Sequence, residues 1–124
     1  MLNRGVLVAA LLLGACGGGS SPNSPSPPPG PNTVVINASG AVTPSELVVS
    51  PGTRVLFVNN HNRRHNMTSD PHPEHTDCDP INSVGLLNPG QQRETGNLVE
   101  VRTCGFHDHD DDQNNALKGR IIVR

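Results

Sequence analysis

Short apolar runs and clusters of turn-forming residues alternate along the chain from Thr33 onward. In the run 98–103, charged side chains alternate with Val99 and Val101, a two-residue period that places both valines on the buried face of a strand. No segment shows the period of an amphipathic helix. Short strands separated by turns predict an all-β domain, and we expect a Greek-key β-sandwich. The expected strands cover residues 33–36, 46–49, 53–58, 65–69, 98–103 and 120–123.

The beginning of the chain has a different pattern. A short basic start precedes the apolar run 6–13, which is too brief to span a bilayer as a permanent helix. The run ends in Leu13-Gly14-Ala15-Cys16, which resembles the lipobox of bacterial lipoproteins. We therefore expect residues 1–15 to be a lipoprotein signal peptide, cleaved before Cys16, whose thiol is then lipidated. Ordinary signal cleavage that leaves Cys16 free is the alternative.

Residues 16–32 connect this segment to the domain. After Cys16 they are Gly, Ser, Pro and Asn, so they cannot bury enough surface to offset the entropy of ordering, and we expect a tether. The folded domain is then residues 33–124. These features predict a protein of the cell envelope, lipid-anchored to a membrane and exposed to the periplasm or the cell surface. Gly17 stands where an Asp is associated with inner-membrane retention, which favours the outer membrane.

The composition excludes several classes of function. The net charge is -2 and the chain has no Trp or Tyr, so it offers neither a basic stripe nor an aromatic platform for nucleic acid. No Ser-His-Asp arrangement or carboxylate pair has a convincing context, so we expect no enzyme activity and no small-molecule substrate. With two Phe, the core must rest on Val, Leu and Ile. Such a small core would gain stability from a metal or a disulfide.

The strongest chemical signal lies near the C-terminus. In Cys104-Gly105-Phe106-His107 a thiol and an imidazole are three residues apart, just before an apolar final strand. This arrangement offers two ligands to one soft metal ion, and His65 is well placed to add a third. A thiolate with two imidazoles suits copper in both oxidation states. We therefore expect copper as the cofactor.

Five pieces of the chain, which follow one another in the family's order, resemble the cupredoxins, the plastocyanin-like blue copper proteins. The resemblance implies that His65, Cys104 and His107 are the equatorial ligands of a type 1-like site. It also implies that Leu117 takes the axial position, where the family usually has Met, without coordinating. The five pieces are residues 44–59, His65-Asn66-Met67, residues 86–90, Cys104-x-x-His107 and Leu117-x-Gly119-x-Ile121.

The resemblance also implies a role. A rigid sandwich that holds nearly the same copper geometry in both oxidation states suits one-electron transfer, and loss of an axial donor should raise the reduction potential. The leading hypothesis is therefore a membrane-tethered one-electron carrier that works with a redox partner protein.

The chain departs from the family's pattern in the residues around the expected site. The segment 70–78 adds His72, His75 and Cys78, and the long loop after His107 adds His109. In an oxidising compartment Cys78 and Cys104 can form a disulfide, and a bridged Cys104 could not be a thiolate ligand.

Two further hypotheses follow from these departures. One is a copper delivery or tolerance module in which Cys78 is bridged to Cys104 and the site is made of imidazoles, from His65, His107 and His109 with His72 or His75. The other is a metal-free cupredoxin-fold lipoprotein. His61 and the acidic run 108–112 are expected to be solvated.

Overall fold

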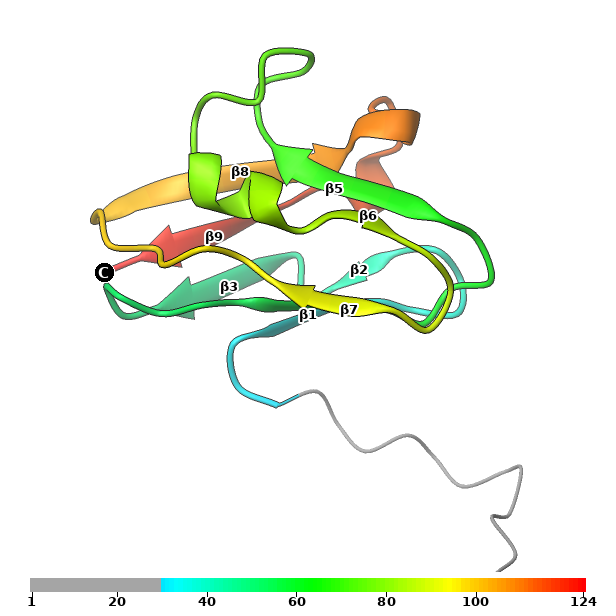
Figure 1. Ribbon diagram of the computed structural model, residues 1–124, viewed down its shortest axis with the longest axis horizontal. Helices are drawn as coiled ribbons and strands as arrows, with labels where there is room; N and C mark the ends of the chain where they lie inside the picture. Colours follow the sequence, from blue (N-terminus) through cyan, green and yellow to red (C-terminus); the bar gives the residue numbers. More distant parts are fainter. Residues whose placement is uncertain (1–29) are drawn as a thin grey trace, which may run out of the picture.

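Two β-sheets face each other across an apolar core in the computed structural model, which describes residues 30–124 (Figure 1). The predicted signal peptide, the lipidation site Cys16 and the tether as far as residue 29 lie outside the described residues. Within residues 30–124, no helix has the length and apolar character needed to cross a membrane.

The first sheet has four strands in the order β2-β1-β4-β7, and the second has five in the order β3-β9-β8-β5-β6. The pairs β1–β4 and β3–β9 are parallel, and the other neighbours are antiparallel. This arrangement confirms the expected all-β sandwich. The strands are β1 (Thr33–Ile36), β2 (Val42–Thr43), β3 (Glu46–Val49), β4 (Leu56–Asn59), β5 (His65–Ser69), β6 (Gly85–Leu87), β7 (Gln92–Glu94), β8 (Arg102–Asp108) and β9 (Gly119–Val123).

Three short 3-10 helices complete the described part of the chain. They are η1 (Asp79–Ser83), η2 (His109–Asp111) and η3 (Asn115–Leu117). The first follows the loop after β5, and the other two lie between β8 and β9. The segments that depart from the cupredoxin pattern therefore fold as short turns at the ends of β5 and β8.

The core is built mainly from Val, Leu and Ile, as the composition predicts, with the Phe57 and Phe106 rings at its centre. These two rings meet edge to face, with centroids 5.1 Å apart. The inward orientation expected for Val99 and Val101 is wrong, because these side chains are 62% and 71% exposed. The strand β8 begins only at Arg102, so the two-residue period before it is not the period of a strand.

The pairing of β5 with β8 decides where the candidate ligands lie. These strands are antiparallel, with Thr68 opposite His107 and Met67 opposite Asp108. Phe106 packs on Phe57 of the other sheet, so the side of β8 that carries Phe106 and Asp108 faces the core. Successive side chains of a strand point to opposite faces. His107 therefore lies on the outer face of the second sheet.

Candidate metal centre

Three histidines from two segments meet on this outer face. His72 and His75 come from the loop after β5, and His107 comes from β8. One ring nitrogen of each lies within 4.8 Å of the others. His72 is exposed, His75 is half-buried and His107 is only 2% exposed, so the group runs from the surface into the protein.

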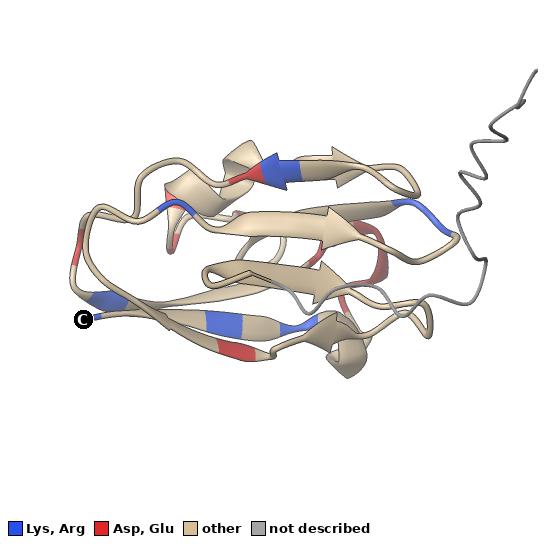
Figure 2. Ribbon diagram, turned by 90° about the horizontal axis from the view of Figure 1, so that it is seen from below, with Lys and Arg blue, Asp and Glu red and all other residues tan. Residues whose placement is uncertain are grey.

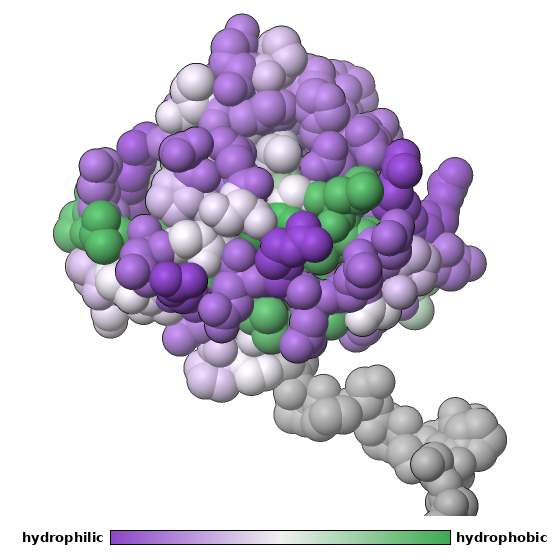
Figure 3. Space-filling view, viewed as in Figure 1, coloured by the Kyte–Doolittle hydropathy of each residue, from purple (hydrophilic) through white to green (hydrophobic). Residues whose placement is uncertain are grey.

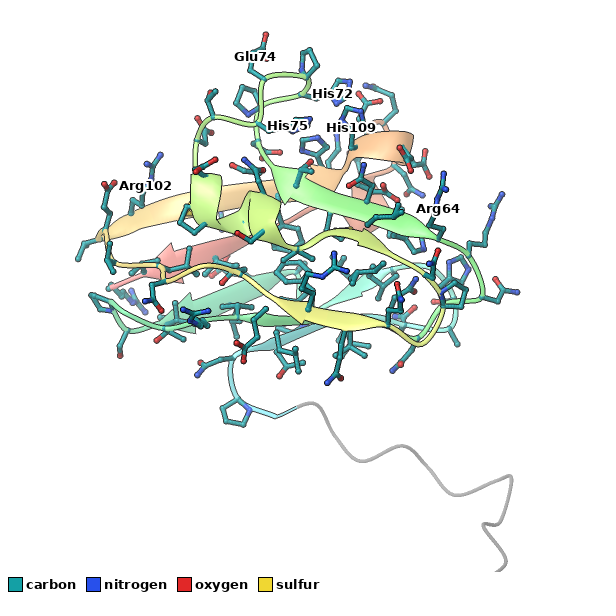
Figure 4. All side chains as sticks on the ribbon, in the orientation of Figure 1. Arg64, His72, Glu74, His75, Arg102 and His109 are labelled. Carbon is teal, nitrogen blue, oxygen red and sulfur yellow. A yellow bond between two sulfur atoms is a disulfide. The ribbon has the colours of Figure 1, made fainter. Side chains whose placement is uncertain are left out.

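His109 adds a fourth imidazole to this group. Its Nδ1 lies 2.8 Å from Nε2 of His75. The centroid of its ring is 4.9 Å from those of both His72 and His75. Figure 4 shows His72, His75 and His109 side by side beyond the ends of β5 and β8. We call the four residues His72, His75, His107 and His109 the outer histidine cluster.

The outer histidine cluster includes an imidazole nitrogen that lacks a partner. Nε2 of His107 is buried and makes no hydrogen bond to any atom of residues 30–124. A buried polar atom without a partner costs free energy, and native structures satisfy nearly all of them. A metal ion bound by the neighbouring imidazoles would satisfy this nitrogen. The donor set therefore fits a metal that accepts nitrogen ligands, such as copper or zinc.

The prediction of Cys104 as a thiolate ligand is wrong in this structure. Cys104 forms a disulfide with Cys78, with the two Cα atoms 5.6 Å apart, and both side chains are buried. The structure contains the Cys78–Cys104 disulfide that the alternative hypothesis predicted. The bridge ties the loop that carries His72 and His75 to the strand that carries His107.

His65 does not join His107, which corrects the ligand set implied by the cupredoxin resemblance. The Nδ1 atom of His65 lies 2.7 Å from Oδ2 of Asp108, and its Nε2 lies 2.8 Å from Nδ1 of His61. Because β8 alternates its faces, Asp108 stands beside His65 on the core side while His107 points outward. Leu117, expected at the axial position, lines the same hollow as His65 and Asp108.

Sequence reasoning missed the buried position of Asp108 beside His65. The acidic run 108–112 was expected to be solvated, yet Asp108 is only 2% exposed. Its carboxylate accepts hydrogen bonds from the backbone N–H groups of Asn66 and Asp110 as well as facing the His65 ring. His61 takes part in this chain and is half-buried rather than solvated. Alternation of side chains after His107 is the signal that could have placed Asp108 on the core face.

The surroundings of the outer histidine cluster are polar and acidic. Figure 3 shows a hydrophilic surface over the loop beyond β5, and Figure 2 shows acidic residues gathered in the turn after β8. A hydrogen bond from the Gln113 side chain lowers the pKa of the exposed Asp112 carboxyl. Ionised carboxylates near the cluster raise the local concentration of cations.

Comparisons with known proteins identify the fold. No family model matches the sequence, and no curated protein matches it. The structure is similar to a purple cupredoxin from Nitrosopumilus maritimus, with a TM-score of 0.57 and 18% identity over 74% of this chain and 98% of that one. Plastocyanin from Dryopteris crassirhizoma gives a TM-score of 0.58 and 20% identity over 74% and 99% of the two chains.

An amicyanin variant in the Cu(I) form gives a TM-score of 0.55 and 18% identity, over 74% of this chain and 80% of that one. The expected Greek-key sandwich of cupredoxin type is thereby confirmed. The fold and the site together define a cupredoxin-fold domain that carries a histidine cluster and a disulfide.

Proposed function

We propose that this protein binds copper through the outer histidine cluster and serves in copper delivery or copper tolerance at the cell envelope. The observation that carries the proposal is the buried, unpartnered Nε2 of His107, next to the ring nitrogens of His72 and His75. His109 is the fourth candidate ligand. Copper, when bound there, would supply a cation that imidazole holds in both oxidation states.

Copper is favoured over other divalent ions by two arguments. Among first-row divalent metals, nitrogen sites bind Cu²⁺ most tightly. One of the fold neighbours, amicyanin, is described with Cu(I). The site geometry alone is compatible with zinc as well, so the metal identity rests on affinity and on the fold neighbours.

Copper delivery or tolerance is favoured over a blue-copper electron carrier by the state of Cys104. A type 1-like site needs a thiolate, and the sulfur of Cys104 is bonded to Cys78. His72, in contrast, is exposed, so the cluster has one ligand at the surface through which an ion can be exchanged with a partner.

One-electron transfer to a redox partner protein is the second candidate. The disulfide joins the loop after β5 to β8, and these two segments carry three of the four candidate ligands. Such a constraint limits rearrangement of the ligands between the two oxidation states of copper. The reduction potential of the copper-loaded protein, measured by voltammetry, bears on this candidate.

Copper delivery or tolerance and one-electron transfer both place copper on imidazoles alone here. Both therefore predict a different visible spectrum from the type 1-like hypothesis. Protein loaded with Cu(II) should be pale, because no sulfur-to-copper charge transfer is available. The His75→Ala variant should bind copper more weakly than the parent, and His61→Ala, outside the cluster, should bind it equally well. Visible absorption, electron paramagnetic resonance and a titration against a competing chelator measure these outcomes. An intense blue colour, or equal effects of the two substitutions, would contradict the proposal.

The proposed location depends on the beginning of the chain. We propose that lipidation of Cys16 anchors the domain to a membrane, with residues 17–32 as the tether. The protein produced in bacteria should then partition into the detergent phase on phase separation. The Cys16→Ser variant should move to the aqueous phase. Equal partitioning of the two proteins would exclude the lipid anchor.

A further inference from the structure

Two adjacent residues at the end of β5 hold two of the candidate ligands. The backbone carbonyl of Ser69 lies 2.8 Å from Nδ1 of His75. The carboxylate of Asp70 lies 2.6 Å from Nδ1 of His107. A carbonyl oxygen only accepts hydrogen bonds, and so does an ionised carboxylate. Both imidazoles therefore donate from Nδ1.

This donation determines which nitrogen of each ring can bind a metal. A neutral imidazole carries one N–H, so a ring that donates from Nδ1 has its lone pair on Nε2. For His107 this is the buried nitrogen that has no partner among residues 30–124. For His75 it is the nitrogen that faces His109. The end of β5 thus orients two rings from two different segments toward one point.

The carboxylate of Asp70, which contacts His107, occupies the space beside Gly105 of β8. The N–H of Asp70 donates to the carbonyl of Gly105, with a distance of 3.0 Å. A Cβ atom on Gly105 would overlap Oδ2 of Asp70 and lie 2.9 Å from its Cγ. Gly105 is absent from the glycines with a positive φ angle. In its present orientation the Asp70 carboxylate therefore leaves no room for a Cβ at position 105.

We infer that Asp70 is a positioning residue for the metal site and that Gly105 provides the space for its carboxylate. The inference rests on the proposed function of the outer histidine cluster. Carboxylates that hold the second nitrogen of a ligating histidine fix its tautomer and raise its basicity. The side chain of Asp70 is 42% exposed, and its carboxylate accepts a hydrogen bond from the neutral, buried His107 ring. Its contribution lies in the orientation of His107.

The experiment compares Asp70→Ala with Asp77→Asn in the full-length protein. Asp77 is an exposed acid of the same loop, so its substitution removes the same charge without touching His107. In metal-free protein, nitrogen-15 NMR of the imidazoles should show His107 protonated on Nδ1 in the parent and in Asp77→Asn. Asp70→Ala should lose this preference. Its Cu(II) affinity should fall by roughly 10–100-fold, as for other outer-shell partners.

Gly105→Ala provides a second variant that leaves the carboxylate in the chain. It should shift the His107 tautomer in the same direction as Asp70→Ala, because the added methyl group displaces Asp70. An unchanged tautomer in Asp70→Ala, or equal loss of affinity in Asp70→Ala and Asp77→Asn, would overturn the inference. The tautomer is read without metal. Parent protein that shows the expected tautomer but binds no Cu(II) would therefore refute the proposed function instead, and with it the metal-related role of Asp70.

Discussion

Replacing His107 with alanine should cause the largest loss of copper affinity of any single substitution in this protein. His107 is the most buried of the four candidate ligands, and its Nε2 is the atom that a metal would satisfy. Loss of an outer-shell partner costs roughly 10–100-fold in metal affinity, so loss of the ligand itself should exceed about 100-fold. Competition with a chromophoric chelator measures the change.

The matched control for His107→Ala is His65→Ala. His65 is also a buried histidine that faces a carboxylate, but it lies on the core side with Asp108. We expect His65→Ala to lower stability while leaving copper affinity within a few-fold of the parent. If His65→Ala abolished binding and His107→Ala did not, the metal centre would lie at the position that the cupredoxin resemblance implies.

Removal of the disulfide should give the largest loss of stability. The bridge between Cys78 and Cys104 closes a loop with a sequence separation of 26 residues. Disulfides of this kind stabilise a domain by roughly 2–4 kcal/mol. The double variant Cys78→Ser with Cys104→Ser should lose about this amount in urea unfolding, because a small core without Trp or Tyr has little stability to spare.

The same double variant should also bind copper more weakly. Cys78 follows His75 by three residues, and Cys104 precedes His107 by three, so the bridge holds two ligand segments together. A copper titration in native buffer measures the effect. A double variant as stable as the parent would show that the bridge does not form. Titration of Cys78 and Cys104 as two free thiols in the parent protein would show the same.

Most of the fold could be predicted because its signals are local. Apolar runs such as Thr33–Ile36 and Glu46–Val49 show their strand character within a few residues, and the turns between them carry their own glycines and prolines. The error at Val99 and Val101 has the same origin. Alternation in the sequence indicates a strand only where a neighbouring strand is present to pair with, and β8 begins after these residues.

The candidate site could be predicted only in part. Histidine as the ligand type and the individual residues His72, His75, His107 and His109 were all among the candidates named from the sequence. The grouping of His65 with His107 was wrong. It followed the cupredoxin resemblance, whereas the register of β5 and β8 places Asp108 beside His65.

The class of fold, the residue types available for a metal and the two cysteines that can pair could all be read from the sequence. The class of fold depends on residues close together in the chain, and the other two features follow from which residue types the chain contains. The folded arrangement was needed to show that Cys104 is bridged to Cys78 and that the histidines divide into the outer histidine cluster and the core-side pair of His61 and His65. Both outcomes depend on strand register and on the two faces of β8, because a shift of one residue along a strand exchanges the faces of all its side chains.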